Sequence, residues 1–207
     1  DLENRIVQNL KDLLKNYSFT NVNADNELVE NQEKKFGIKL DSIQRQAIQE
    51  ALQNKVLIIT GGPGTGKTTL VRFIIGVMSR HIKKSMALAA PTGRAAKKLT
   101  ETTGVEALTI HRLLEFGREK SQSKGSNQKE DEDKYRFHRN KKKPLKQELL
   151  IIDETSMVDT ELMDALLEAV PLYARLILVG DVDQLPSVGP GTMLLDLIES
   201  HLVPVIR

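Results

Sequence analysis

The most distinctive chemistry in this 207-residue chain belongs to eight consecutive residues, Gly61-Gly62-Pro63-Gly64-Thr65-Gly66-Lys67-Thr68. They follow a predicted strand, Val56–Thr60, and precede a segment whose apolar residues have helical spacing. The glycines let backbone N–H groups wrap around phosphate oxygens, and the N-terminus of the following helix adds the positive end of its dipole. The pattern therefore predicts a nucleotide-phosphate loop, the alternative being an ordinary glycine-rich turn between a strand and a helix.

Two side chains of this loop have defined roles in such a site. Lys67 can reach the β and γ phosphates of a nucleotide, and the hydroxyl of Thr68 can ligate Mg²⁺. We therefore expect Mg²⁺ to be bound together with ATP. The predicted nucleotide-binding residues of the loop are Gly62, Pro63, Gly64, Thr65, Gly66, Lys67, Thr68 and Thr69.

A pair of carboxylates ends a second apolar run, Leu149–Ile152. Because Mg²⁺ prefers hard oxygen ligands, we expect Asp153 to hold the ion directly or through a water molecule. We expect Glu154 to orient and deprotonate the attacking water, a role that favours hydrolysis over transfer to a bound acceptor. Two acids at an ordinary strand end are the alternative, which the presence of a phosphate loop disfavours.

A neutral polar residue, Gln184, follows a third apolar run, Leu176–Val179. The carboxyl end of a strand is where ligands bind in open α/β sheets. An amide there can hydrogen-bond the γ-phosphate or the attacking water without cancelling the charge of Mg²⁺. Asp181 and Asp183 are either further partners of the site or caps of the turn. The predicted catalytic residues are thus Lys67, Glu154 and Gln184.

Hydrophobic periodicity predicts the elements that must position these groups. Nearly continuous apolar runs are typical of strands covered on both faces, and they occur at Val56–Ile59, Met86–Ala90, Leu149–Ile152 and Leu176–Val179. Helical spacing follows these runs, from Lys67 to about Ser79, Gly93 to Thr102, Asp159 to Val170 and Thr192 to Ser200. This alternation predicts an α/β fold with a parallel sheet flanked by helices.

The part of the chain before the first strand is predicted to be mainly helical. Ile6, Leu10 and Leu13 recur at helical spacing, and a second helix is expected from about Ser42 to Asn54. The polar residues between them, from about Asn16 to Gln32, predict a loop or short turns.

A long polar stretch from Gly117 to Lys146 interrupts the strand–helix alternation. It contains an acidic run, Glu130–Asp133, and a mostly basic run, Arg139–Lys143. A loop of this length is either functional or a solvated surface insertion, and the sequence leaves both readings open.

Composition limits the classes of protein that fit. The chain has 40% apolar and 28% charged residues, as expected of a globular domain. It contains no run long enough to span a membrane and no cysteine, which excludes disulfides and thiolate metal sites and fits a reducing cytosol. A net charge of +2 does not by itself indicate nucleic-acid binding, and 4% aromatic residues are a poor supply for stacking bases.

In their order along the chain and in their residues, these segments resemble the motifs of superfamily 1 DNA helicases, most closely those of the RecD-like group that moves 5′ to 3′. Besides the eight-residue loop, the segments that carry the resemblance are Phe36–Gln46, Ala90–Ala96, Thr109–Leu114, Ile152–Met157 and Val179–Pro186. The resemblance implies a RecA-like P-loop NTPase domain that couples ATP hydrolysis to translocation on single-stranded DNA and duplex unwinding, in DNA repair or recombination.

The resemblance also implies roles for individual residues. Gln44 matches the glutamine that reads adenine, the alternative being an exposed helix residue. The segments that contact the DNA backbone correspond to Pro91, Thr92, Arg94, Thr109 and His111. Hydroxyls, backbone amides and arginine are suitable phosphate ligands. Without the resemblance, His111 would be read as a packed or capping histidine and Arg94 as a surface charge.

The resemblance predicts how the chain is divided. Residues 1–35 are expected to be the tail of an N-terminal helical domain and residues 36–207 a motor lobe. Residues 117–146 are expected to form a hairpin-like pin with Tyr135–His138 as one arm, although the acidic run departs from a DNA-facing tip. The first residue, Asp1, and the apolar end after Leu202 predict a part excised from a longer protein.

Such motors close two RecA-like lobes over ATP, and the second lobe supplies arginine fingers worth roughly 10³–10⁵ in rate. We therefore expect a monomeric, poorly active half-motor. Its expected partners are single-stranded DNA, duplex junctions and the second lobe in the cytoplasm, with no membrane.

Two other functions remain open at this point. One is a nucleotide-dependent switch or assembly ATPase that does not translocate. The other is a small-molecule kinase, which is disfavoured because Glu154 suits water activation and no acceptor pocket is evident. DNA-stimulated ATP hydrolysis separates the motor from both.

Overall fold

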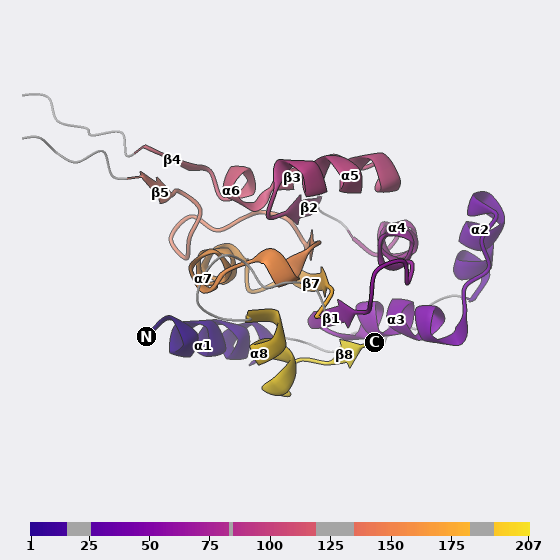
Figure 1. Cartoon of the computed structure of the whole chain (residues 1–207), viewed down its shortest axis with the longest axis horizontal. Coiled ribbons are helices and arrows are strands. Elements are labelled where there is room, and N and C mark those ends of the chain that lie inside the picture. Colours follow the sequence, from indigo (N-terminus) through magenta and orange to yellow (C-terminus); the bar gives the residue numbers. More distant parts are fainter. Residues whose placement is uncertain (16–25, 83–84, 119–134, 183–192) are drawn as a thin grey trace, which may run out of the picture.

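The computed structural model describes residues 1–15, 26–82, 85–118, 135–182 and 193–207. In these residues the fold is built on a six-stranded sheet whose neighbours are all parallel, in the order β3-β2-β6-β7-β1-β8 (Figure 1). Its strands are β1 (Val56–Thr60), β2 (Met86–Ala90), β3 (Ala107–Thr109), β6 (Leu149–Ile152), β7 (Arg175–Gly180) and β8 (Val205–Ile206). The predicted parallel α/β fold is confirmed.

Helices cover both faces of the sheet. One face carries α2 (Asn26–Phe36), α3 (Ser42–Gln53), α4 (Lys67–Met78) and α5 (Gly93–Thr103). The other face carries α1 (Leu2–Lys15), α6 (Ile110–Leu113), α7 (Thr160–Ala169) and α8 (Met193–Glu199). Each face therefore has its own apolar core, and the strands lie between the two.

The central strands are largely apolar because both faces of the sheet are buried. Along β1, Ile58 packs into the core beneath α7, whereas Leu57 and Ile59 pack into the core beneath α4. All three side chains are buried, because successive side chains of a strand point to opposite faces. A strand covered on both sides needs an apolar residue at each position.

The predicted bounds of the main elements agree with the structure within about two residues, but one loop prediction is wrong. The segment expected to be a loop up to Gln32 contains the first turns of α2, which begins at Asn26. Only Val29 of this helix is buried, so its apolar periodicity is too weak to read. Tertiary contacts hold it instead, since the ring of Phe36 packs edge-on against Phe73 of α4 with centroids 5.2 Å apart.

The long polar stretch is partly ordered structure rather than one loop. Strand β4 (Phe116–Arg118) pairs antiparallel with β5 (Tyr135–Phe137), so the expected hairpin arm is present and projects from the body of the domain (Figure 1). The residues after β5 return along the body, where Leu145 is buried and donates its N–H to the carbonyl of Ala169 at 2.8 Å.

Hydrogen bonds between oppositely charged side chains hold the base of the hairpin together. Glu115 accepts hydrogen bonds from Arg139 and, at 2.9 Å, from Lys143. These two bonds lower the pKa of Glu115 below its usual range. Part of the basic run therefore has a structural role, because it joins the two ends of the hairpin.

Helices α1 and α2 do not have a core of their own within the described residues. Ile6, Leu10 and Leu13 of α1 belong to the core beneath α7, and Val29 of α2 belongs to the opposite core. The two helices are thus packed as parts of this domain, whatever precedes or accompanies them in a longer protein. None of the helices in the described ranges is long and apolar enough to cross a membrane.

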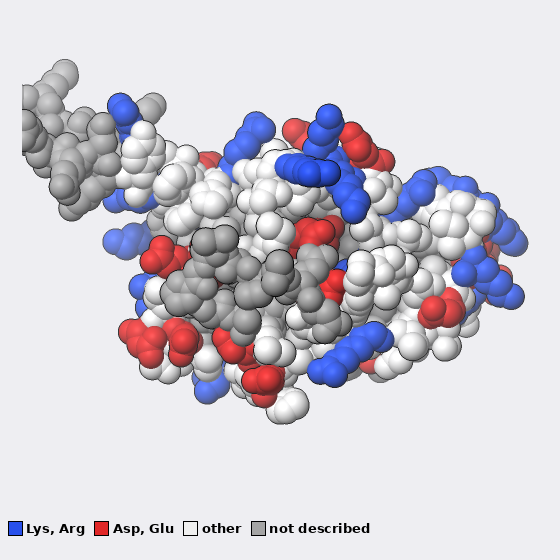
Figure 2. Space-filling view, viewed as in Figure 1, with Lys and Arg blue, Asp and Glu red and all other residues white. Residues whose placement is uncertain are grey.

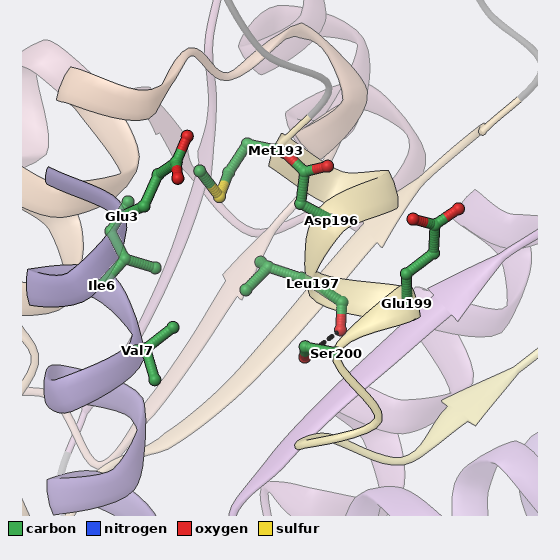
Figure 3. A pocket seen from close by; sticks show the side chains of 8 residues that line it. All are labelled: Glu3, Ile6, Val7, Met193, Asp196, Leu197, Glu199 and Ser200. Atoms are coloured by element: carbon green, nitrogen blue, oxygen red, sulfur yellow. Dashed lines mark hydrogen bonds between the residues drawn. The ribbon is translucent and has the colours of Figure 1, made fainter.

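Between α1 and α8 lies a cavity of about 350 Å³. Figure 3 shows Ile6 and Val7 of α1 on one side and Leu197 of α8 on the other, with Glu199 at its edge. None of the predicted catalytic or binding residues lines this cavity.

Arg5 fastens α1 to α7. Its Nη2 lies 2.5 Å from Oδ2 of Asp164 and 2.9 Å from Oε1 of Glu168. The Asp164 side chain is 5% exposed, and burial raises its pKa while the positive charge of Arg5 lowers it. The salt bridge therefore offsets the cost of a buried carboxylate.

We expect Arg5→Ala to lower the free energy of unfolding by about 1–2 kcal/mol, because it leaves Asp164 buried without its cation. The full effect of a buried pair is not expected, since half of the Arg5 side chain is exposed to water. Urea unfolding measures the change, with Lys11→Ala on the exposed face of the same helix as the control. Equal unfolding curves for the two variants would contradict the prediction.

Candidate nucleotide and magnesium site

The phosphate loop joins the end of β1 to the start of α4, as predicted. Gly64 and Gly66 have φ angles of 78° and 81°, which favour glycine over residues with a side chain. Gly66 is the residue immediately before the helix, and a Cβ there would lie 3.2 Å from Nε2 of Gln44. The loop thus needs glycine both for its backbone angle and for the close approach of Gln44.

Lys67 is held over the loop by the loop's own backbone. Its Nζ donates to the carbonyl oxygen of Gly61 at 2.5 Å and to that of Gly62 at 2.8 Å. The hydroxyl of Thr65 donates to the same Gly62 oxygen at 2.9 Å. A phosphate oxygen is a stronger acceptor for an ammonium group than a carbonyl, so an incoming nucleotide can compete for Lys67.

A cavity of about 210 Å³ lies beside the loop. It is lined by Asp41, Ile43, Gln44, Ile59, Thr60, Gly61, Thr65, Lys67, Leu70, Ile206 and Arg207. The backbone N–H of Asp41 donates to Oε1 of Gln44 at 3.1 Å, which forms one half of a capping box for α3. The structure therefore places Gln44 at the loop, while its reading of adenine remains a prediction.

The two carboxylates follow β6, which is separated from β1 by β7 alone. Asp153 is 9% exposed, and its Oδ1 accepts the backbone N–H of Glu154 at 2.9 Å. Burial raises the pKa of Asp153, and the negative charge of Glu154 raises it further. The positive charges of Lys67 and Lys98 oppose this shift, so the loop lysine acts on the carboxylate across β7.

Glu154 has an unusual backbone conformation. Its φ of 53° and ψ of 39° lie in the left-handed region, which costs a residue with a side chain about 1–3 kcal/mol. The surroundings enforce it, since the short helix η1 (Thr155–Met157) follows at once and packs against β7. A Cβ on Gly180 of β7 would lie only 3.1 Å from the backbone nitrogen of Ser156, so a glycine there permits this packing.

The donor set fits a magnesium ion shared with a nucleotide. Mg²⁺ usually takes one or two protein oxygens and completes its shell with phosphates and water. Asp153 and Thr68 supply a carboxylate and a hydroxyl of that kind from β6 and α4. Within the described part of the chain, no group of three or more acidic or histidine side chains is placed to hold a metal ion.

Two buried hydroxyls at this edge of the sheet were missed by the sequence reasoning. Oγ1 of Thr60 and Oγ of Ser156 have no hydrogen-bond partner among the described residues. A buried polar atom of this kind is usually satisfied by water or a ligand. Thr60 directly precedes the phosphate loop, and Ser156 closely follows the acidic pair. This adjacency to the two motifs is the sequence signal that could have marked both residues as candidates for the site.

The predicted DNA contacts lie at the same edge of the sheet. Thr92 follows β2 and Thr109 ends β3, its neighbour in the sheet. Each threonine caps a helix, because Oγ1 accepts a backbone N–H at 3.2 Å from Ala95 and from Arg112 respectively. These capping roles were not predicted from the sequence, and they leave each hydroxyl its own proton to donate to a phosphate.

Pro91 lies beside these residues, and Arg94 and His111 are exposed. Figure 2 shows Lys and Arg side chains interspersed with acidic ones along the part of the surface formed by α5, and further acidic side chains nearer the middle of this face. The predicted catalytic Gln184 lies outside the described residues.

A parallel sheet with a glycine-rich phosphate loop after one strand and a carboxylate pair after another defines a P-loop NTPase domain of the RecA-like class. The crystal structure of a DEAD box protein from Methanococcus jannaschii has a similar fold, with a TM-score of 0.52 at 13% identity. The match covers 92% of this chain and 56% of that protein.

Residues 44–190 match the AAA domain family, and the chain belongs to that family. The ATP-dependent RecD2 DNA helicase of Deinococcus radiodurans is 38% identical over 81% of this chain. The RecBCD enzyme subunit RecD of Haemophilus influenzae is 36% identical over 95% of it. The chain is therefore a motor lobe of the RecD-like superfamily 1 type, and the predicted family is confirmed. It spans 21% and 32% of the lengths of these two relatives.

We expect Asp153→Asn to make the nucleotide-free chain more stable and its nucleotide binding less dependent on Mg²⁺. Burial raises the folded-state pKa of Asp153, so the ionised form destabilises the fold at every pH above that value. The gain from Asn should be largest there and should vanish below ~4, the ordinary aspartate pKa, where the group is protonated in both states. Thermal unfolding across pH measures the stability change.

Calorimetric titration of ATP with and without Mg²⁺ measures the second effect. Asp159→Asn is a suitable control, because Asp159 is another helix-proximal aspartate whose side chain caps α7 away from the loop. A wild-type response to Mg²⁺ in Asp153→Asn would contradict the assignment of Asp153.

Proposed function

We propose that this chain is the ATP-binding half of a DNA motor. In the full-length protein it would couple ATP hydrolysis to translocation on single-stranded DNA and to duplex unwinding, in DNA repair or recombination. The observation that carries the proposal is the convergence of Lys67, Asp153 and Glu154 at one edge of a parallel sheet, with the predicted DNA contacts on the two neighbouring strands of the same edge.

Each group of the site has a defined role in hydrolysis. Lys67 would leave the loop carbonyls to neutralise the terminal phosphates, and Thr68 and Asp153 would hold Mg²⁺. A bound Mg²⁺ would supply positive charge that stabilises the phosphates during the reaction. Glu154 accepts a proton from the attacking water, and Gln184 hydrogen-bonds that water or the γ-phosphate.

The sheet itself links the two functions. Strand β2 lies between β3 and β6, and the backbone N–H of Asp153 donates to the carbonyl of Ala89 at 2.9 Å. The segment from Pro91 to Arg94 leaves β2 directly after that contact. A shift of this segment on DNA therefore acts on the strand that fixes the magnesium ligand, which is a short physical path between the sites.

The rest of the motor is supplied by other parts of a longer protein. Because the relatives extend over several times the matched length, we propose that a second RecA-like lobe closes on the nucleotide and supplies arginine fingers. The chain alone would be monomeric and slow. Single-stranded DNA and duplex junctions would be its nucleic-acid partners, in the cytoplasm. Residues 117–146 would form a small pin subdomain, and residues 1–35 would continue from an N-terminal helical domain.

The proposal predicts that single-stranded DNA stimulates ATP hydrolysis by the full-length protein at least tenfold, and that the 207-residue chain alone hydrolyses ATP roughly 10³-fold more slowly. Steady-state phosphate release with and without oligonucleotide measures both rates. Unstimulated hydrolysis by a full-length protein that binds Mg-ATP would instead support a nucleotide-dependent switch. Fast turnover by the chain alone would show that it needs no second lobe.

A further inference from the structure

The hairpin formed by β4 and β5 carries aromatic groups on one face. Its antiparallel register places Phe116 opposite Phe137 and Arg118 opposite Tyr135. Because residues two apart on a strand point to the same side, all four of these side chains share one face of the hairpin. Arg136 lies between two of them and points to the other face.

The rings on this face form a continuous series. The centroids of Phe116 and Phe137 are 4.9 Å apart, and those of Phe116 and Tyr135 are 5.9 Å apart with only 29° between the ring planes. The ring of His111 meets that of Phe116 edge-on at 5.4 Å. The hairpin thus holds three of the eight phenylalanine and tyrosine residues of the chain, although the low aromatic content of the sequence predicted a poor supply for stacking bases.

The outer rings of the series are accessible to a partner. Phe116 is 44% exposed and Tyr135 is 54% exposed, whereas Phe137 is half-buried and packs against the core beneath α7. Phe137 therefore anchors the hairpin, while Phe116 and Tyr135 present flat apolar surfaces. Two stacked, exposed rings are costly to leave in water and are typical of a binding surface.

The charges around the rings identify the class of partner. Nε of Arg118 donates to the hydroxyl of Tyr135 at 3.0 Å, and its guanidinium carbon lies 5.7 Å from the centre of that ring. Arg136, whose side chain points away from the rings, lines a separate groove of about 580 Å³ together with Lys141–Lys143 and Glu168. An occupant that suits the rings and the guanidinium of Arg118 is anionic and carries flat rings, and a single strand of nucleic acid has both features.

The position of the rings agrees with this partner. His111 lies in α6, which begins directly after Thr109 at the carboxyl end of β3. The aromatic series therefore starts at the proposed DNA contacts and continues outward along the hairpin. A strand that touches Thr109 by its phosphates can reach Phe116 with its bases.

We propose that Phe116, Tyr135 and Arg118 form a stacking surface for the bases of single-stranded DNA. The chain then holds the strand through its bases as well as its backbone, with little preference for base identity because every base has a flat face. This inference rests on the proposed DNA-motor function and adds a second mode of contact to it.

The test compares two fluorescent oligonucleotides of equal length, one of thymidines and one with abasic sugars that keeps all phosphates. By fluorescence anisotropy, the wild-type chain should bind the thymidine strand roughly tenfold or more tightly than the abasic strand. The Phe116→Ala/Tyr135→Ala double variant should lose this difference while keeping its affinity for the abasic strand. Tyr135→Phe should keep it, since the ring remains.

Tyr173→Ala is a matched control, because Tyr173 is 47% exposed and lies in the turn between α7 and β7. A second measurement avoids deleting a ring. The chain contains no tryptophan, so Phe116→Trp introduces a single reporter whose fluorescence should be quenched by the thymidine strand and not by the abasic strand.

Equal binding of both strands by the wild-type chain would overturn the stacking surface and leave the DNA motor intact. A double variant that keeps the preference for bases would overturn it as well. Binding of neither strand, with Mg-ATP affinity unchanged, would contradict the DNA function itself. If sedimentation shows that the wild-type chain self-associates and the double variant does not, the rings form a contact between copies and the proposal is wrong.

Discussion

The Lys67→Ala variant is expected to bind Mg-ATP at least ~100-fold more weakly than the wild-type chain. Charge-assisted hydrogen bonds contribute about 1.5–3 kcal/mol each, and Lys67 is expected to make them to both the β and the γ phosphate. No neighbouring side chain of the loop can replace it, because the loop otherwise consists of glycine, proline and threonine. Isothermal titration calorimetry measures the loss directly.

The same substitution must be separated from unfolding. In the nucleotide-free chain Lys67 donates to the carbonyls of Gly61 and Gly62, so Lys67→Ala also removes two contacts of the loop. Thermal unfolding without nucleotide should show only a small change, because Gly61 and Gly62 are themselves partly exposed. In the presence of Mg-ATP the wild type should gain about 2.7 kcal/mol at a concentration of 100 times Kd, and the variant should gain almost nothing.

Lys39→Ala is the control, since Lys39 is an exposed lysine before α3. It should bind Mg-ATP as the wild type does. If Lys67→Ala retains wild-type affinity while Lys39→Ala lowers it, the nucleotide does not bind at the loop, and the site proposed here is wrong.

Most of the fold could be predicted because the signals that define it are local and redundant. The strand Val56–Thr60 is apolar at its first four positions and buried at all five, because both faces of the sheet are covered. The loop after it is rich in glycine, and two of its glycines, Gly64 and Gly66, have the positive φ angles that favour this residue. A short apolar strand and the glycine-rich motif that follows it were therefore sufficient to predict the position of the nucleotide site.

The features that escaped prediction depend on tertiary contacts. Helix α2 is held by Phe36 against Phe73 and by Gln32 against Gly76, whose added Cβ would lie 2.7 Å from Gln32 Cδ, rather than by an apolar stripe of its own. The three-residue strand β3 is stabilised by pairing with β2 and is too short to carry a pattern. Local sequence patterns do not predict α2 or β3, because each is stabilised by contacts with another element, α4 for α2 and β2 for β3.

The candidate site shows the same division. The residue types at Asp153 and Glu154 could be predicted from sequence, but the left-handed backbone of Glu154 could not, because η1 and Gly180 enforce it. The aromatic face of the hairpin was missed for a related reason. Phe116 and Tyr135 are far apart in the sequence, and only the register of β4 with β5 brings their rings together.

Glu154→Gln is expected to reduce the rate of ATP hydrolysis by the full-length protein roughly 10²–10⁴-fold while leaving Mg-ATP affinity nearly unchanged. Glutamine has the same shape as glutamate but does not accept the proton of the attacking water. The contact between Glu154 and Asp153 uses the backbone N–H of Glu154, so it survives the substitution and the magnesium ligand keeps its position. The left-handed conformation also survives, because η1 and β7 impose it on the backbone.

Single-turnover hydrolysis in the full-length protein measures the chemical step, and calorimetry measures affinity in parallel. Glu161→Gln, a change of the same kind on an exposed position of α7, should leave both unchanged. Two results would contradict the role of Glu154 in different ways. Hydrolysis at the wild-type rate would show that another group accepts the proton. An equal loss of affinity and rate would show that Glu154 supports nucleotide binding, and the general base would then have to be sought elsewhere at the carboxyl edge of the sheet.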